Sequence, residues 1–167
     1  MSGIVIRPAQ QSDLSALLAI YNHYVVNTPA TFDIEPRTLA QRQEWFDQFS
    51  PLGRYRCFVA ADGMDIAGYA CSARFKEREA YSTSIETSVY CAPDKMRRGT
   101  GRALYATLFE ALKGEDIHRA FGGVTLPNPG SVGLHEAMGF RLIGTYTEIG
   151  RKFGKYWDVG LYLRDMR

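Results

Sequence analysis

The chain has 167 residues, a length typical of one domain that buries most of its apolar surface without needing a disulfide or a metal. Its net charge of +2 is too small to argue for a nucleic-acid partner, and no apolar run approaches the ~20 residues that cross a membrane. The three cysteines form no C-x-x-C pair and no Cys/His cluster, so we expect buried, reduced thiols in a cytoplasmic protein and no zinc site.

Helix and strand signals alternate along the chain. Ser12 precedes apolar residues at helical spacing and is the expected N-cap of the first helix. Thr38 followed by Gln41 fits a capping box, and Asp62-Gly63 between two apolar runs predicts a hairpin turn. In chain order, the expected elements are a strand at 4–6, helices at 13–24 and 38–49, strands at 56–61, 66–74 and 82–91, a helix at 102–113, a strand at 120–126, a helix at 131–138, and two strands flanking a turn at 150–155.

This interleaving of strands and helices predicts an α/β (α+β) fold. We expect a single domain over residues 1–167, with a mixed central β-sheet flanked by helices.

The segment 95–102, between a predicted strand and a predicted helix, carries the strongest chemical signal. Its glycines let the backbone approach a ligand, and the helix N-terminus offers unsatisfied N–H groups to an anion such as a pyrophosphate. The pattern alone fits a solvated basic turn equally well. It is neither a P-loop nor the Rossmann fingerprint, because Leu104 stands where the third glycine belongs. The residues that would hold a pyrophosphate are Arg97, Arg98, Gly99, Thr100, Gly101 and Arg102.

The same segment resembles the acetyl-CoA loop of the GNAT superfamily of N-acetyltransferases. Gly99 and Gly101 match the glycines of that motif, and Met96 stands where Gln or Arg is usual. Further segments look like the phosphinothricin acetyltransferase branch, which includes the methionine sulfoximine and methionine sulfone acetyltransferases; they are residues 20–24, 86–90, 126–140 and 150–158. The resemblance covers nearly the whole chain in order. It implies a GNAT-like acetyl-CoA-dependent N-acetyltransferase without a metal, which forms a homodimer and acts on the α-amine of a small amino-acid-like substrate.

The resemblance also implies further contacts with acetyl-CoA. Val89, Tyr90 and Cys91 end the splayed strand whose backbone would pair with the pantetheine arm. Asn128 and Ser131 would flank the thioester end.

Glu86 and His135 are the candidate catalytic residues. Acetyl transfer requires the amine to lose a proton, and a carboxylate in a partly dry cleft has a raised pKa that suits this task. By pattern alone Glu86 is a surface residue of an alternating strand, and the resemblance favours the general base. His135 lies on the short helix where many GNAT enzymes carry the acid that protonates the leaving thiolate, although a lone helix histidine is as readily structural.

The charged segment 75–81 is the candidate substrate-binding loop, together with Glu86. Lys76 or Arg78 would grip an acidic group of the substrate, whereas Glu77 and Glu79 could neutralise the loop and leave it solvated. Phe32 and Tyr24 could line the same pocket. The loop residues predicted to bind the substrate are Phe75, which stands where tryptophan is common in the branch, Lys76, Arg78, Glu79 and Tyr81.

Three other functions remain open at this stage. They are a GNAT enzyme that acts on protein N-termini or aminoglycosides, a domain that binds acetyl-CoA without catalysis, and a nucleic-acid-binding module. The absence of an extended basic stripe argues against the last.

Overall fold

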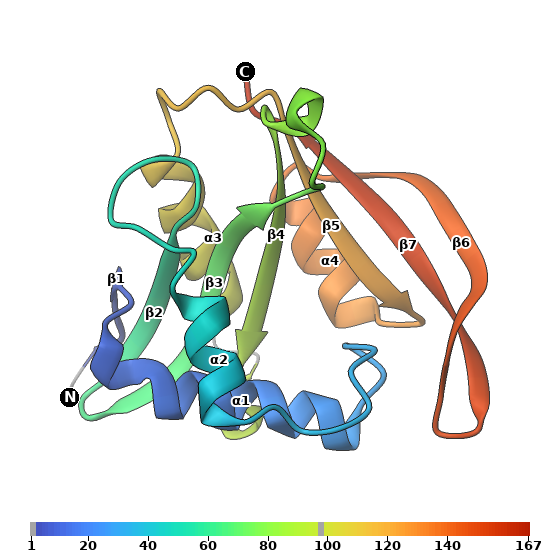
Figure 1. Cartoon of the computed structure of the whole chain (residues 1–167), viewed down its shortest axis with the longest axis horizontal. Helices are drawn as coiled ribbons and strands as arrows, with labels where there is room; N and C mark the ends of the chain where they lie inside the picture. Colours follow the sequence, from blue (N-terminus) through green and yellow to red (C-terminus); the bar gives the residue numbers. More distant parts are fainter. Residues whose placement is uncertain (1–2, 97–98) are drawn as a thin grey trace.

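The computed structural model describes residues 3–96 and 99–167, in which seven strands form one sheet (Figure 1). Neighbouring strands follow the order β1-β2-β3-β4-β5-β7-β6, and every pair is antiparallel except β4 with β5. This mixed sheet confirms the predicted fold class. The helices and strands are β1 (Val5–Pro8), α1 (Leu14–Asn27), α2 (Leu39–Phe46), β2 (Cys57–Asp62), β3 (Asp65–Arg74), β4 (Ser84–Cys91), α3 (Thr100–Ala111), β5 (Arg119–Leu126), α4 (Pro129–Ala137), β6 (Arg141–Lys152) and β7 (Lys155–Asp165), with 3-10 turns η1 (Gln11–Asp13), η2 (Glu79–Tyr81) and η3 (Pro93–Lys95).

Helices cover both faces of the sheet and produce two cores. Helices α1 and α2 lie on one face, and α3 and α4 lie on the other (Figure 1). The alternation of β4 decides which side chains enter each core: Ile85 joins the core under α3, whereas Tyr90 packs on the α1 side. Fully buried members of the α3 core include Ile85, Leu104, Tyr105 and Leu108, and those of the α1 core include Leu17, Val59 and Tyr69.

The first helix begins later than its sequence predicts. Ser12 is not the N-cap, because it lies inside the turn η1. The buried carboxylate of Asp13 fixes the start of the helix instead. It accepts hydrogen bonds from the Arg7 guanidinium at 2.7 and 2.8 Å and from the Gln10 N–H at 2.8 Å. The bond from Arg7 lowers the pKa of Asp13.

The capping box at α2 and the turn between β2 and β3 agree with prediction. The Thr38 hydroxyl accepts from the Gln41 N–H, and the Gln41 side chain accepts from the Thr38 N–H. Gly63 adopts a φ of 65°, as the hairpin requires. The helix α2 ends at Phe46 and not near Phe49, because the chain turns there and the Phe49 N–H donates to the Phe46 carbonyl at 3.0 Å. The Phe49 ring packs on Trp45, with ring centres 4.8 Å apart.

Strands β4 and β5 pair at one end and diverge at the other. Their parallel ladder comprises only Ser84 with Arg119, Ile85 with Ala120, and Glu86 with Phe121. Both strands continue beyond the last of these pairs, and Figure 1 shows them separating like the arms of a V, with α4 behind the opening. Beyond Glu86, β4 therefore presents an edge inside the sheet that β5 does not cover.

The hairpin of β6 and β7 extends beyond the rest of the sheet (Figure 1). Its register shifts between Tyr146 and Gly150, which bends the outer strand. Exposed apolar side chains gather on this hairpin: Leu142, Ile143, Tyr146, Ile149, Phe153 and Tyr156. No helix in the described part of the chain is long and apolar enough to cross a membrane.

Candidate functional site

The hydrogen bonds between β3 and β4 decide which backbone groups face the V-shaped opening. The Ala92 N–H donates to the Ala67 carbonyl at 2.9 Å, and the antiparallel register continues from there without a shift. Residues of an antiparallel strand alternate between bonding to the neighbour and pointing away from it. Cys91 and Val89 therefore direct their N–H and C=O groups toward the opening, whereas the backbone of Tyr90 bonds to β3.

A side-chain contact on the open edge of β4 supports this orientation. The Tyr24 hydroxyl donates to the Cys91 carbonyl at 2.6 Å. That bond occupies Cys91 and makes Val89 the better placed of the two to pair with an extended ligand. The Tyr90 ring packs against Tyr21, Tyr24 and Tyr69 and does not face the opening.

The helix α3 begins beside the open edge of β4. Gly99, with a φ of 77°, precedes it in the left-handed conformation, and the helix starts at Thr100 and not at Arg102 as predicted. A Cβ on Gly101 would stand 3.1 Å from Leu134 and 3.7 Å from the Cys91 sulfur, so glycine is what allows α3, α4 and β4 to meet here. The buried Thr100 hydroxyl has no hydrogen-bond partner among the described residues.

The surroundings of the α3 N-terminus fit the predicted pantetheine and pyrophosphate of acetyl-CoA. A free strand edge suits an extended amide-bearing chain, and the first-turn N–H groups of α3 suit a phosphate. Arg102 lies in that first turn. Arg97 and Arg98 fall outside the described residues, so their predicted role stays a prediction.

Glu86 stands at the vertex of the V, as the last residue of β4 that pairs with β5. The side chain is exposed to solvent on one side. Protein atoms on its other side partly desolvate the carboxyl and raise its pKa. Among the described residues, none forms a hydrogen bond or an ion pair with this carboxylate. A carboxylate with a raised pKa and no bound partner is suited to accepting a proton.

His135 is buried below β5, in the core under α3. Its Nδ1 lies 2.8 Å from the Ser131 carbonyl, which can only accept, so Nδ1 carries the proton and Nε2 can accept from the Tyr105 hydroxyl at 3.3 Å. Burial lowers the pKa of His135 and favours this neutral form. The role of His135 as the acid stays a prediction, and its contacts favour a part in holding α4 against the sheet.

The contact between His135 and Gly122 gives a prediction about stability. A Cβ on Gly122 would stand 2.7 and 2.9 Å from two atoms of the His135 ring, so Gly122→Ala must displace the ring or the strand. We expect a loss of about 1–3 kcal/mol in the free energy of unfolding, measured by urea denaturation. Gly123→Ala is the matched control, because its Cβ would meet Val159 at an ordinary 3.7 Å. Equal stability of the two variants would contradict this packing.

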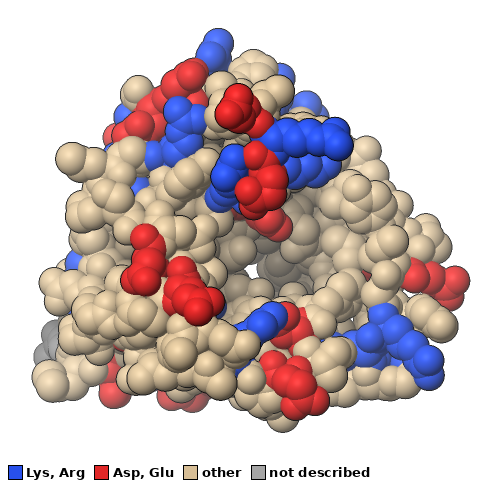
Figure 2. Space-filling model, viewed as in Figure 1, with Lys and Arg blue, Asp and Glu red and all other residues tan. Residues whose placement is uncertain are grey.

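The segment 75–81 lies beside Glu86, because its first residue, Phe75, packs on β5. The Phe75 ring stacks on the Phe121 ring, with ring centres 4.3 Å apart, and Phe121 pairs with Glu86 in the β4–β5 ladder. The Lys76 amine lies 5.1 Å from the centres of both the Phe75 and Tyr81 rings. Lys76, Glu77, Arg78 and Tyr81 border a hollow of about 290 Å³, and Glu79 is exposed on η2. In Figure 2, this charged group forms the upper rim of a central depression.

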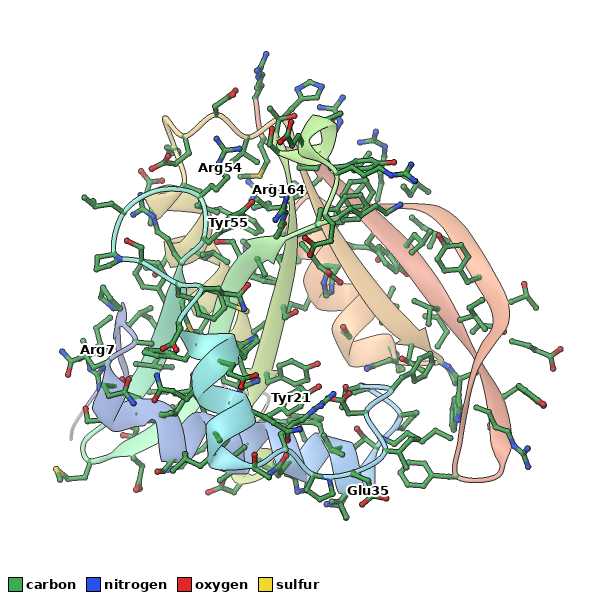
Figure 3. The ribbon with its side chains drawn as sticks, in the orientation of Figure 1. Arg7, Tyr21, Glu35, Arg54, Tyr55 and Arg164 are labelled. Atoms are coloured by element: carbon green, nitrogen blue, oxygen red, sulfur yellow. The ribbon has the colours of Figure 1, made fainter. Side chains whose placement is uncertain are left out.

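A larger cleft of about 420 Å³ opens on the α1 and α2 face of the sheet. Ser88 contributes to it from β4, on the face that also carries Glu86, and Tyr21 reaches it from α1 (Figure 3). Sequence reasoning missed this cleft and its buried arginine, Arg42. It proposed Phe32 and Tyr24 as pocket residues, but Phe32 packs against Gly150 of the outer hairpin and Tyr24 bonds to Cys91.

The remaining predicted residues cap α4. The Asn128 side chain accepts from the Ser131 N–H at 3.1 Å, which fixes the start of this helix beside the opening. In the described ranges, no group of three or more His, Cys, Asp or Glu residues is arranged to hold a metal ion.

Comparison with known proteins identifies close relatives. A profile of the acetyltransferase (GNAT) domain matches residues 6–161. The phosphinothricin N-acetyltransferase of Streptomyces coelicolor is 48% identical over 165 residues, which span 98% of this chain and 96% of that protein. The L-methionine sulfoximine/L-methionine sulfone acetyltransferase of Pseudomonas aeruginosa is 36% identical over 155 residues, or 92% of this chain and 90% of that protein. A phosphinothricin acetyltransferase from Sinorhizobium meliloti, solved with acetyl-CoA, superposes with a TM-score of 0.92 at 29% identity, over 99% of this chain and 89% of that one.

Proposed function

The chain belongs to the GNAT acetyltransferase family and is an acetyl-CoA-dependent N-acetyltransferase, and we propose that it acetylates the α-amine of a small amino-acid-like substrate with Glu86 as the general base. The observation that carries this proposal is the position of Glu86 at the vertex between β4 and β5. The relatives named above support a substrate of the phosphinothricin, methionine sulfoximine or methionine sulfone type.

Acetyl-CoA supplies the acetyl group as a thioester, and the side chains supply binding and proton transfer. The open backbone of Val89 and the start of α3 would hold the donor along the V. At the vertex, Glu86 would take a proton from the substrate ammonium, directly or through a water. Its raised pKa suits this step, because the carboxylate is a stronger base than an ordinary glutamate.

The charge balance of the segment 75–81 supports an anionic group on the substrate. Glu77, which could have neutralised the loop, pairs with Arg74 at 3.2 Å. Lys76 and Arg78 have no ion-pair partner among the described residues, so both cations are available at the rim beside Glu86. A free carboxylate next to the reacting amine would meet them. A peptide N-terminus lacks that carboxylate, and an aminoglycoside would meet repulsion.

The preference for a free carboxylate is testable with methionine sulfoximine and its carboxyl-amidated analogue. We expect kcat/KM to be about 10-fold or more higher for the free acid, because a charge-assisted hydrogen bond contributes about 1.5–3 kcal/mol. Lys76→Ala or Arg78→Ala should reduce this preference. The control is Lys113→Ala, an exposed lysine just beyond the end of α3. Equal rates for acid and amide in the wild type would refute the assignment of the loop.

We also propose that the protein is a homodimer that pairs through the exposed apolar side chains of the β6–β7 hairpin. Apolar patches of this kind commonly mark interfaces. Sedimentation should give a dimer at micromolar concentration, and Ile149→Asp should shift it toward the monomer, because a buried unpaired carboxylate is costly. Met64→Asp, at the fully exposed turn between β2 and β3, should have no such effect. A wild-type monomer would refute the proposal.

A further inference from the structure

Arg42 is a buried arginine on the floor of the cleft between α2 and the sheet. Its side chain is packed in an aromatic box, with the guanidinium carbon 3.3 Å from the ring centre of Trp45, 4.7 Å from that of Tyr21 and 5.2 Å from that of Tyr69. The residue is 4% exposed. These contacts fix the plane of the guanidinium and hold it at the floor of the cleft, which Arg42 lines.

The positive charge of Arg42 is not balanced within the described part of the chain. Its Nη2 donates to the Tyr69 hydroxyl at 2.6 Å, and its Nε is buried without a hydrogen-bond partner. No described carboxylate lies within ion-pair distance. A buried arginine without an anion is unusual, because desolvation of the charge costs free energy that a carboxylate normally offsets.

The two acidic residues that line the same cleft do not neutralise Arg42. Asp33 is bonded to the Arg37 guanidinium, with Nε at 2.8 Å, and to the Tyr21 hydroxyl at 2.5 Å. Glu44 is exposed at the mouth of the cleft, where water and salt screen it. The cleft therefore has a paired charge at its side, a screened acid at its rim and an unpaired cation at its floor.

The register of β3 and β4 locates Arg42 relative to Glu86. The side chains of Tyr69, Cys71 and Ser88 line the cleft together with Arg42. Cys71 pairs with Ser88 across the two strands, and the next pair on the same face, two residues further along each strand, is Ala73 with Glu86. That step is about 7 Å along a strand, and all these side chains lie on one face. A small molecule whose amine reaches Glu86 can thus extend along β4 to Arg42.

We propose that Arg42 is a specificity-determining residue, which binds the anionic or oxygen-rich head at the distal end of an amino-acid substrate. This inference rests on the proposed function and divides the recognition of the substrate between two places. Lys76 and Arg78 bind the carboxylate beside the amine, at the rim, and Arg42 binds the distal head in the cleft. A phosphinate, sulfoximine or sulfone presents paired oxygen or nitrogen acceptors that match the donor fork of a guanidinium.

The test compares phosphinothricin with norleucine, which keeps the α-amino acid but has no polar head. We expect Arg42→Gln to lower the ratio of kcat/KM for phosphinothricin to that for norleucine about 10- to 100-fold. Calorimetry without an acetyl donor should show the same selective loss of phosphinothricin affinity. Arg42→Lys should lower the ratio less, because lysine keeps the charge and loses the fork. Arg56→Gln is the matched control: Arg56 is also largely buried, but it pairs with Glu115 at 2.9 Å and lies outside the lining of the cleft.

The outcomes separate the two proposals. A ratio that stays at the wild-type value in whichever Arg42 variant folds overturns the role of Arg42 and leaves the proposed function standing. Equal losses of kcat/KM for phosphinothricin and norleucine, together with a lowered melting temperature, also overturn the role of Arg42 in specificity, because they indicate a structural role. A wild-type enzyme that acetylates neither amino acid overturns the proposed function and, with it, this inference.

Discussion

Glu86→Gln should lower kcat by about 100-fold or more at neutral pH while leaving the affinity for acetyl-CoA little changed. Glutamine keeps the shape of the side chain and cannot accept the proton of the ammonium. Steady-state kinetics with methionine sulfoximine would measure the loss, and calorimetry would measure acetyl-CoA binding. Glu110→Gln is the matched control, because that carboxylate lies on the surface of α3 and pairs with Lys113.

The pH dependence of the rate provides a second signature of Glu86. The base works only when it is deprotonated, so its raised pKa should move the acidic limb of the kcat/KM profile above the ordinary range of glutamate, near pH 4.3. In Glu86→Gln this limb should disappear. The rate of the variant should also approach that of the wild type at high pH, where more of the substrate amine is already deprotonated. A variant with wild-type turnover at neutral pH would exclude Glu86 as the base.

The same substitution should not destabilise the protein. Because the folded-state pKa of Glu86 lies above its unfolded value, the residue favours folding when it is protonated, and this contribution is lost as pH rises through the folded pKa. At neutral pH, Glu86→Gln should therefore leave the melting temperature equal or slightly higher. Loss of activity with unchanged stability is the pattern expected of a catalytic group.

Gly101→Val should weaken acetyl-CoA binding by about 10- to 100-fold. The extra methyl groups would fill the space in which α3, Leu134 and Cys91 converge beside the open edge of β4. Overpacking of this kind costs about 1–3 kcal/mol, and we expect most of this cost to fall on the ligand-bound state, because the donor and the new side chain would compete for the same space. Calorimetric titration of acetyl-CoA would measure the change.

Gly133→Ala separates this effect from a general effect on α4. Gly133 lies in the same helix as Leu134, and a Cβ there meets nothing within 4 Å. Alanine should favour the helix by about 0.5–1 kcal/mol and leave acetyl-CoA affinity as it is. Wild-type affinity in Gly101→Val would show that the donor does not approach this junction.

Local signals in the sequence predicted much of the fold. The capping box at Thr38 and the turn at Gly63 involve neighbouring residues, so their geometry follows from short-range chemistry. The start of α1 did not follow from such a signal. Ser12 has the right residue type, but the Arg7–Asp13 pair, which joins the first strand to the turn η1, decides where the helix begins.

The candidate site was predictable only in part. The resemblance to a known family proposed Glu86 as the base and the loop before α3 as the phosphate site, and the register of β4 then showed which backbone groups face the opening. Arg42 carries no local signal, because a lone arginine in a helix is normally a solvent-exposed residue. Its partner Tyr69 is 27 positions away, and only the packing of α2 onto β3 brings the two together.

The most direct test of the account is a thiol-release assay of the wild-type protein with acetyl-CoA and a panel of amines. The panel contains methionine sulfoximine and phosphinothricin, a peptide with a free N-terminus, and an aminoglycoside. We predict the highest kcat/KM for the two free amino acids, with product mass showing acetylation of the α-amine. Faster turnover of the peptide or the aminoglycoside, or binding of acetyl-CoA without release of thiol for any amine, would contradict the account.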